Sequence, residues 1–538
     1  MMKEIYYEQD ARAKVLSGAK KLYDAVKVTY GPKGQNVIIE KEYGAPVITH
    51  DGVTVAEAVD LGSTKENMGE KVGADLIKAA AQKLNKVAGD GTTTVTVLTY
   101  NILAEANKLI AAGVNPMELR KGIEKAGAEI VKKIDSLSEK IEGDDKKVAE
   151  VATISAGDKE IGELIADVIS KIGKDGVITV EAGQGLDMEE EIVEGFNYDK
   201  GFASAFFVTD VNRQEAIMDK PLILLTDKKI TASSDILPLL EKVAQSGKKD
   251  LIIIAEEVSG EALSLLVLNK LKGVFNTIVL KAPAFGDRRK EIMEDIAVLT
   301  DATVVSEDKG MKLEEVGLEV LGSAKKVIAT KDDSTIIEGA GSKKAVKDRI
   351  NLIESQAAVA NSDYERGEFE KRKAALSGKV AVIKVGGATE PEIDEKKYRV
   401  DDAVSATRAA LAEGIVAGGG VTLVNLAKTL KGTDNGTKII KNALKAPFIH
   451  ILDNAGLNSQ ALLAEVEKAR DGFGFNVMEP EKGILDMKKI GVIDPARVTR
   501  EAVQNAVSIA ATTITMGAMI TIVPEPPKSE TPDMSGMY

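Results

Sequence analysis

The chain has 538 residues, of which 44% are hydrophobic and 29% charged, and its net charge at pH 7 is −13. A chain of this length exceeds one compact core, so we expect two to four domains. The composition is typical of a folded soluble protein, and the acidic balance argues against a nucleic-acid binder, which would carry a basic face.

Several residue types and motifs are missing from the sequence. It has no cysteine, which excludes disulfides and thiolate sites, and the two histidines, His50 and His450, leave little for a histidine-based metal cluster or triad. It has neither a Walker-type nor a Rossmann-type phosphate motif. It also has no run of eighteen apolar residues and no secretory signal, so we expect a cytoplasmic protein. Carboxylates, hydroxyls and main-chain amides remain to carry any chemistry.

Residues 1 to about 137 are predicted to be mostly helical. Alanine, lysine and leucine recur at helical spacing in residues 11–28, 73–87 and 95–110. A short apolar run at residues 36–40 predicts a strand between these helices.

Two turn-like segments flank this strand. Residues 29–34, TYGPKG, contain glycines that allow a ligand to approach the main chain closely, and Lys33 could offset phosphate charge. A ligand-contacting loop and a plain turn explain this segment equally well. His50-Asp51-Gly52, further along, is by itself only a turn signal.

The segment Gly89-Asp90-Gly91, followed by three threonines, is the strongest local signal in the sequence. Main-chain N–H groups at a glycine-rich helix start form a cradle for anions, and the helix dipole favours phosphate there. Asp90 adds the hard oxygen that Mg²⁺ prefers when it also bridges phosphates. An ordinary helix cap requires less than this combination, so we predict a nucleotide-phosphate site.

The centre of the chain has a different pattern of apolar residues. Short apolar runs at 222–225, 251–254 and 277–280 are separated by helical segments, which predicts a buried parallel sheet. The predicted helix 261–271 has apolar residues around most of its circumference. Residues 236–240 also contain more apolar residues than a single buried face requires. Either both faces of the helix are buried, or one face is an exposed apolar surface that binds partners.

The last part of the chain returns to a helical pattern. Asp402 lies beside an apolar stripe in a helix predicted to begin near Arg399, and the pattern alone favours compensation of the helix dipole in the first turn. Gly418-Gly419-Gly420 is a second phosphate-type motif, at the start of the helical stretch 414–523. Because such motifs occur near both ends, we predict that the two ends form one domain with the α/β part inserted. The polar tail, 524–538, is predicted to be disordered.

Taken together, these segments resemble a known family. The likeness rests on TYGPKG, HDGVTVAEA, ENMG, AGDGTTT, APAFGDRRKEI, DDAVSATRAALAEGIVAGGG and GVIDPARVTR, which run in family order from Thr29 to Arg500. The set resembles the group I chaperonins, the GroEL family. The resemblance implies an ATP-driven chaperone whose subunits assemble in sevenfold rings, usually two back to back. Non-native polypeptides would fold inside under a GroES-type lid.

The fold implied by this resemblance is multidomain, with α and α/β parts. A mostly helical equatorial ATPase domain would comprise residues 1–137 and 413–523. A small α/β intermediate domain would comprise 138–194 and 381–412. The α/β apical domain, residues 195–380, would bind polypeptides and the lid.

The resemblance also implies ATP, Mg²⁺ and K⁺ as ligands and assigns residues to them. Asp90 would ligate Mg²⁺, while Asp402 and Asp51 would position or activate the attacking water, which replaces the dipole role of Asp402. The other positions that match the family's nucleotide contacts are Thr29, Tyr30, Gly31, Pro32, His50, Gly91, Thr92, Thr93, Thr94, Gly419, Asn476, Val477, Met478 and Asp494. The positions that match its polypeptide- and lid-binding residues are Phe202, Phe206, Phe207, Leu237, Leu240, Leu263, Val267 and Leu268.

Two alternatives stay open, and neither includes a nucleic-acid or membrane partner. A group II chaperonin shares the GDGTTT loop but would carry its own lid as an apical insertion, and the sequence has no extra segment of that kind between Lys229 and Leu271. A non-catalytic scaffold or adhesion protein could keep the fold without turnover. The intact Asp51, Asp90 and Asp402 argue against that loss.

Overall fold

The computed structural model describes residues 3–40, 46–62, 64, 67–174, 176–183, 185–210, 213–360 and 362–523. The chain is a mixed helix and sheet protein, 54% helical, and it divides into two compact units. Unit 1 comprises residues 1–174, 180–189 and 385–538, and unit 2 comprises 175–179 and 190–384. The first and the last described residues therefore belong to unit 1. The predicted tail, 524–538, lies outside the described residues, and a separate intermediate domain stays a prediction.

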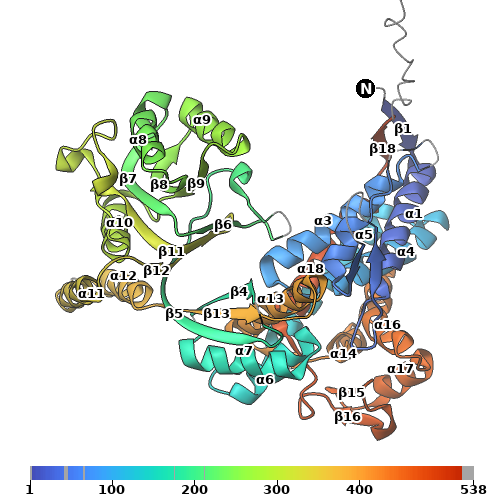
Figure 1. The fold of residues 1–538 in the computed structure, drawn as a ribbon. Coiled ribbons are helices and arrows are strands. Elements are labelled where there is room, and N and C mark those ends of the chain that lie inside the picture. Colours follow the sequence, from blue (N-terminus) through green and yellow to red (C-terminus); the bar gives the residue numbers. More distant parts are fainter. Residues whose placement is uncertain are drawn as a thin grey trace, which may run out of the picture. The chain divides into compact units, whose positions relative to one another are not determined.

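Unit 1 is mainly helical (Figure 1). Its long helices carry alanine, valine, isoleucine and leucine at a period of 3.6 residues, and these side chains pack into one continuous core. The fully buried Leu22, Ile77, Leu98 and Ile130 come from four different helices of this core. The helices of unit 1 are α1 (Glu8–Lys27), α2 (Gly52–Ala58), α3 (Glu70–Ala88), α4 (Thr92–Ala111), α5 (Pro116–Leu137), α6 (Asp145–Ala156), α7 (Lys159–Ile172), α13 (Glu390–Glu413), α14 (Val421–Thr429), α15 (Asn435–Ala443), α16 (Ala446–Asn454), α17 (Ser459–Lys468) and α18 (Ala496–Thr513).

The strands of unit 1 form small antiparallel pairs that join distant parts of the chain. The first strand pairs with the last one, and a strand beside the glycine motif 418–420 pairs with the strand that carries Asp494. These pairs are β1 (Lys3–Tyr7) with β18 (Ala518–Ile522), β2 (Val37–Ile39) with β3 (Val47–Thr49), β14 (Ile415–Ala417) with β17 (Ile493–Pro495), and β15 (Phe473–Phe475) with β16 (Ile484–Asp486).

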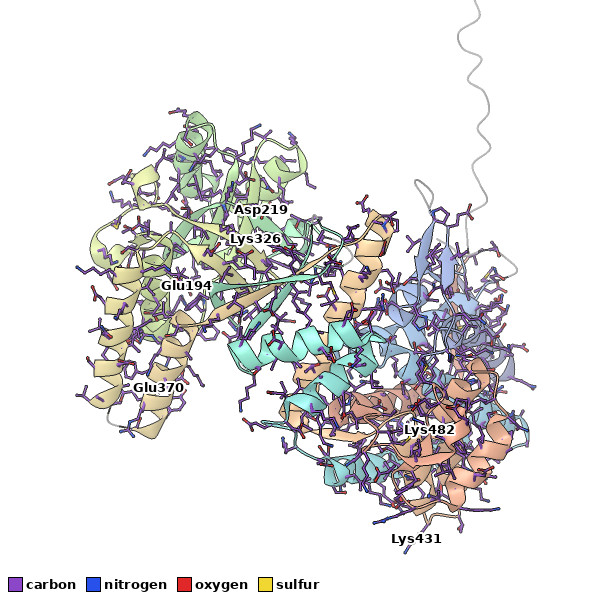
Figure 2. The ribbon with its side chains drawn as sticks, turned by 60° about the horizontal axis from the view of Figure 1, so that its bottom comes forward. Glu194, Asp219, Lys326, Glu370, Lys431 and Lys482 are labelled. Carbon is purple, nitrogen blue, oxygen red and sulfur yellow. The ribbon has the colours of Figure 1, made fainter. Side chains whose placement is uncertain are left out.

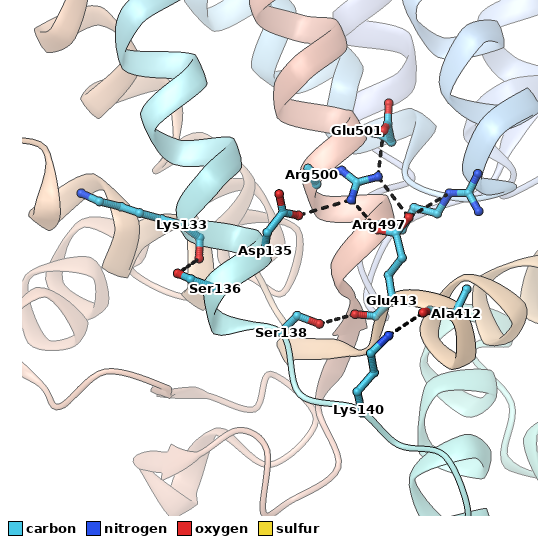
Figure 3. Close-up of polar contacts among 10 residues, drawn as sticks. All are labelled: Lys133, Asp135, Ser136, Ser138, Lys140, Ala412, Glu413, Arg497, Arg500 and Glu501. Atoms are coloured by element: carbon cyan, nitrogen blue, oxygen red, sulfur yellow. Dashed lines mark hydrogen bonds and ion pairs between the residues drawn. The ribbon is translucent and has the colours of Figure 1, made fainter.

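A polar network joins the end of α5, the end of α13 and the start of α18 (Figure 3). The Arg500 guanidinium donates to Glu413 Oε1 at 3.1 Å and lies 3.3 Å from Asp135 Oδ1. Just after α5, Lys140 donates to the carbonyl oxygen of Ala412 at 2.6 Å, and Ser138 donates to that of Glu413. Segments more than 250 residues apart in the chain are thereby held together inside unit 1.

Unit 2 is built around a mixed sheet covered by helices. Its strands run in the order β13-β5-β12-β11-β7-β8-β9, and one large apolar core fills the space between the sheet and the helices. The unit boundaries fall inside β4 (Val177–Ala182) and at the end of β13 (Lys379–Val385). The other elements are β5 (Glu189–Tyr198), β6 (Ala216–Asp219), β7 (Leu222–Ile230), α8 (Ser233–Gln245), β8 (Asp250–Val258), α9 (Gly260–Leu271), β9 (Asn276–Lys281), α10 (Gly286–Thr300), β10 (Val304–Val305), β11 (Gly322–Ala329), β12 (Ser334–Gly339), α11 (Lys343–Ala358) and α12 (Asp363–Leu376).

The predicted parallel sheet is present only in one half of this sheet. Strands β7, β8 and β9 are parallel neighbours, and β10 pairs with β7 in parallel. Beyond β7, however, β11, β12 and β5 run antiparallel. The parallel strands predicted from the three apolar runs are therefore confirmed, and they form one half of a larger mixed sheet. The other half contains β11 and β12, which form a hairpin with a short turn and need no crossover helix. Strand β11 also pairs with β6 in antiparallel orientation. Figure 2 shows Lys326 of β11 beside Asp219 of β6, and these two side chains form an ion pair of 3.3 Å.

Candidate active site

The loop between α3 and α4 holds Asp90 in a tight main-chain turn. Gly89 and Gly91 both have positive φ, at 69° and 86°, a conformation that glycine adopts without strain. A Cβ on Gly89 would collide with the side chain of Ser405 in α13, and one on Gly91 would lie 2.6 Å from Val498 Cγ1 in α18. The glycines thus let the loop pack directly against two helices, which fixes the position of Asp90.

The Asp90 carboxylate is held from two sides. It accepts hydrogen bonds from the N–H of Gly91 and from Ser155 Oγ of α6, the latter at 3.1 Å. Burial raises the pKa of Asp90, the two hydrogen bonds oppose this shift, and the nearby charge of Asp51 adds to it. The carboxylate is therefore oriented by its neighbours and lies in an environment where a cation would be favoured.

Asp51 caps the short helix α2 and lies beside the threonines of α4. Its carboxylate accepts hydrogen bonds from the N–H of Val53 at 3.1 Å and from the N–H of Thr54 at 2.8 Å, as an N-cap does. A Cβ on the adjacent Gly52 would collide with Thr93 Oγ1. The segment His50-Asp51-Gly52 is therefore packed directly onto the start of α4.

Asp402 lies well inside α13 rather than in its first turn. The helix begins at Glu390, after the cap Thr389, so the prediction that Asp402 compensates the helix dipole in a first turn is wrong. The early turns are mostly polar and give no apolar stripe, which is why the sequence pattern placed the start too late. Burial raises the pKa of Asp402 well above its usual range, and the charges of Asp51 and Asp90 raise it further.

The loop of residues 29–34 is tied to the threonines of α4 and to α16. The Tyr30 hydroxyl and Thr94 Oγ1 are 2.7 Å apart, and Asn454 Nδ2 donates to the Tyr30 carbonyl at 2.9 Å. Gly31 has a φ of 80°, and a Cβ there would lie 3.2 Å from Ile451. Thr29 is buried and Pro32 is exposed.

The His50 side chain packs against the same loop. A Cβ on Gly34 would lie 2.7 Å from His50 Cε1, so only glycine leaves room for the ring in this position. Burial lowers the pKa of His50, which favours the neutral imidazole.

The glycine motif 418–420 meets Asp494 through the pairing of β14 with β17. Val416 is paired with Asp494, and a Cβ on Gly418 would lie 2.8 Å from Asp494 Oδ1. Burial, helped by the charge of Asp90, raises the pKa of Asp494 to about 7. This charge effect places Asp494 near the Asp90 loop.

Residues 476–478 approach Gly419 through a small apolar cluster. Val477 is buried in a cluster with Met487, and a Cβ on Gly419 would lie 3.3 Å from Met487 Cε. Asn476 Oδ1 accepts a hydrogen bond from the N–H of Met478 at 3.0 Å, whereas the Met478 side chain is exposed.

The structure adds three polar residues that the sequence analysis did not select. Ser155 binds Asp90, Asn454 binds the carbonyls of Lys27 and Tyr30, and Ser405 contacts Gly89. Ser155 and Asn454 lie in helices without a quoted motif, and Ser405 lies in the quoted motif around Asp402 but carries no signal of its own, so the three-dimensional packing reveals all three.

The predicted polypeptide-binding residues of unit 2 fall into three groups. Phe202, Phe207 and Leu240 are buried in the core of the unit. Leu263 and Val267 of α9 are partly buried and pack against that core. Three side chains are exposed and could meet a partner as the unit stands: Phe206 at 65%, Leu237 at 43% and Leu268 at 49%.

The donor set around Asp90 suits a hard cation that is shared with phosphate. Within the described ranges, no group of three or more histidine, cysteine, aspartate or glutamate side chains is arranged to hold a metal ion alone. Mg²⁺ usually takes one or two carboxylates and completes its shell with waters and substrate phosphates. Asp90, at the start of an N–H-rich helix, fits that arrangement.

A comparison with known protein families identifies the family to which this chain belongs. The profile of the TCP-1/cpn60 chaperonin family matches residues 22–523, a stretch that spans both units. Members of this family act as chaperones, bind polypeptide substrates, form oligomers and are typically ATPases. No helix in the described part of the chain is long and apolar enough to cross a membrane. Because the match covers most of its length, the chain belongs to the TCP-1/cpn60 chaperonin family and has a chaperone role.

Proposed function

We propose that the chain is a group I chaperonin that hydrolyses ATP in unit 1 and captures non-native polypeptides on unit 2. The observation that carries the ATPase proposal is the convergence of three aspartates on the start of α4. The charges of Asp51 and Asp90 act on Asp402, although the three come from different elements. Repelling carboxylates at a glycine-lined helix start suit a site for a cation and phosphate.

In this proposal the start of α4 binds the phosphates. The N–H group of Thr92 and the hydroxyls of Thr93 and Thr94 would donate to phosphate oxygens, helped by the helix dipole, while the Gly91 N–H stays bonded to Asp90. Asp90 would hold Mg²⁺, and bound Mg²⁺ supplies charge neutralisation for the phosphates. K⁺ is part of the same proposal as a further cation near the phosphates.

Asp402 and Asp51 would act on the attacking water. The raised pKa of Asp402 makes its carboxylate a stronger base than an ordinary aspartate, so it would accept the proton of the water. Asp51 is held rigidly by its N-cap hydrogen bonds and would orient that water.

The remaining matched positions would surround the nucleotide. The loop of residues 29–32 and the main chain at His50 would lie against one side of it. Gly419, Asp494 and the 476–478 strip would contact the ribose and base. Support for this grouping comes from Tyr30, which bonds to Thr94, and from Asp494, whose pKa responds to Asp90.

The proposed capture surface consists of exposed apolar side chains on α8, α9 and the turn at Phe206. Leu237 and Leu268 are each more than two-fifths exposed, on helices that contact each other. Each large apolar side chain removed from water contributes about 1.5–3 kcal/mol. The three exposed side chains and the partly buried Leu263 and Val267 would make four or five such contacts, which could supply the roughly 8 kcal/mol of micromolar binding, even after ordering costs.

Assignment to group I rests on the absence of a built-in lid in a fully described stretch. Between Lys229 and Leu271 the chain forms the end of β7, α8, β8 and α9, with short connections only. A separate GroES-type lid, sevenfold rings stacked back to back and a cytoplasmic location complete the proposal.

A steady-state ATPase assay with and without a denatured protein tests this function. We expect Mg²⁺-dependent ATP hydrolysis whose rate changes when a denatured protein is added. A chain that binds denatured protein but does not hydrolyse ATP would be a scaffold, and the proposal would then be wrong.

A further inference from the structure

The turn that presents Phe206 lies along the outer edge of the unit 2 sheet. Strand β9 is the last strand of the sheet, and the segment before the turn is bonded to it. The N–H of Ala203 donates to the Val279 carbonyl at 2.8 Å, and Phe202 forms an isolated bridge with Leu280. The segment then closes a single 3₁₀ turn, η1 (Ala205–Phe207), which is capped by Ser204.

The two aromatic side chains of η1 point to opposite environments. Phe207 is fully buried in the core, whereas Phe206 is 65% exposed. A turn of three residues makes few main-chain hydrogen bonds of its own, and its last carbonyl groups need other donors.

Lys270, in the last turn of α9, supplies such a donor. Its ammonium donates to the Phe207 carbonyl at 2.6 Å and lies 5.7 Å from the centroid of the Phe207 ring, within cation–π range. The position is desolvated, since burial alone lowers the pKa of Lys270 to about 8. Removing an ammonium group from water costs free energy unless the group is hydrogen-bonded in the protein, and here the Phe207 carbonyl accepts that hydrogen bond.

We propose that Lys270 is a positioning residue that ties the Phe206 turn to α9, so that Phe206 and the exposed side chains of α9 form one continuous capture surface. This inference rests on the proposed capture function of unit 2. With the tie, Phe206 is presented without an ordering cost at the moment of binding. Without it, the described contacts that remain are the hydrogen bonds to β9 before the turn, those of Thr209 with Glu215 and Ile217 after it, and the buried Phe207 ring.

The test compares three variants in the full-length protein. Lys270→Met removes the donor and the charge but keeps the length and apolar stem of the side chain. Lys270→Arg keeps a charged donor, and Lys272→Met removes a lysine from the exposed end of the same helix as a matched control. Capture is measured as the affinity for one chemically denatured, dye-labelled protein without nucleotide.

A second readout follows the turn itself. The chain has no tryptophan, so Phe206→Trp introduces a single emitter at the tip of the turn. Its fluorescence anisotropy reports local mobility, both with Lys270 present and in the Lys270→Met background.

We expect Lys270→Met to lower the anisotropy of Trp at position 206 and to weaken capture roughly 2- to 12-fold, the scale of ordering one side chain at an interface. Lys270→Arg should restore both values, and Lys272→Met should change neither. If Lys270→Met melts unit 2, the neutral polar Lys270→Gln takes its place.

The inference is overturned if Lys270→Met leaves either the anisotropy or the capture at the parent value. A parent protein that fails to capture any denatured protein would instead overturn the proposed function. In that case the anisotropy comparison still reports whether Lys270 restrains the turn.

Discussion

The aspartate site of unit 1 and the apolar surface of unit 2 are built on opposite principles. In unit 1, glycines without a Cβ bring main-chain turns into direct contact with neighbouring helices, and the carboxylates of Asp51 and Asp90 have defined hydrogen-bond partners. In unit 2, the candidate binding side chains are exposed leucines and a phenylalanine on helix faces and a turn.

This difference matches two kinds of chemistry. Phosphate transfer, the chemistry proposed for unit 1, requires charges and donors held to a fraction of an ångström, which suits polar groups on closely packed main-chain turns. Apolar contacts have no preferred direction, so a surface of this kind accepts many unrelated sequences. A substitution in one region should therefore leave the basal activity of the other intact: ATP hydrolysis without denatured protein for unit 2 variants, and capture without nucleotide for unit 1 variants.

The largest expected effect is on the chemical step. Asp402→Ala should leave nucleotide binding nearly intact and slow hydrolysis by roughly 10²–10⁴-fold, because it removes the proposed general base. Asp394→Ala, at an exposed position of the same helix, serves as the control. Steady-state hydrolysis and nucleotide titration measure the two quantities, and an unchanged rate would show that the assigned site is wrong.

Asp90→Ala should act on binding rather than on chemistry. Loss of a residue that merely supports a metal ligand costs roughly 10–100-fold in affinity, and loss of the ligand itself should cost at least as much. Ser155→Ala removes only the hydrogen bond to Asp90 Oδ2 and should have the smaller effect. Titration of the nucleotide with and without Mg²⁺ measures both. Equal affinities for parent and Asp90→Ala would contradict the assignment.

Two leucines of α8 allow the effect of a surface substitution to be compared with that of a core substitution. Leu237 is 43% exposed and Leu240 is 4% exposed. Leu237→Ser should weaken capture of a denatured protein about tenfold or more, which corresponds to about 1.5 kcal/mol of lost burial. Its melting transition and ATP hydrolysis should stay near the parent values.

The matched variant, Leu240→Ser, should lower the stability of unit 2 instead, by about 2–5 kcal/mol, as core truncations do. Thermal melting and protease resistance measure this. If Leu237→Ser folded normally and captured as well as the parent, the surface would not be the binding site.

The raised pKa of Asp494 predicts that the stability of the nucleotide-free protein depends on pH. Its folded-state pKa of about 7 lies above the ordinary value of 3.8. Between these values the unfolded chain has released the proton and the folded chain still holds it, so this group reduces stability as pH rises. Asp494→Asn should therefore gain in melting temperature over the parent as pH increases, up to about 7, and then level off. A gain that is constant with pH would contradict the raised pKa.

The smallest expected effect concerns His50. If this position contributes through its main chain, His50→Lys should change turnover by about 0.5 kcal/mol or less, roughly twofold. A larger change that follows the titration of the imidazole, whose pKa burial lowers below its ordinary value of ~6.5, would show a side-chain role.

Local patterns predicted much of the fold and of the Asp90 loop. The periodic helices and the strands β7, β8 and β9 appear where apolar spacing placed them, because these elements bury one repeated face. The antiparallel half of the sheet and the early start of α13 were not predicted, since hairpin pairing and polar helix turns leave weak apolar signals. Ser155 and Asn454 were also missed, because their roles depend on helices that are distant in the sequence.

The proposed function combines ATP hydrolysis in unit 1 with capture of non-native polypeptides on unit 2, and its most direct test asks whether ATP changes that capture. Because the chain has no tryptophan, the fluorescence anisotropy of a tryptophan-containing denatured protein reports the bound client alone. We predict that the anisotropy rises when the chain is added and falls when ATP and Mg²⁺ follow. An anisotropy that never rises, or that rises and is unaffected by ATP, would contradict the account.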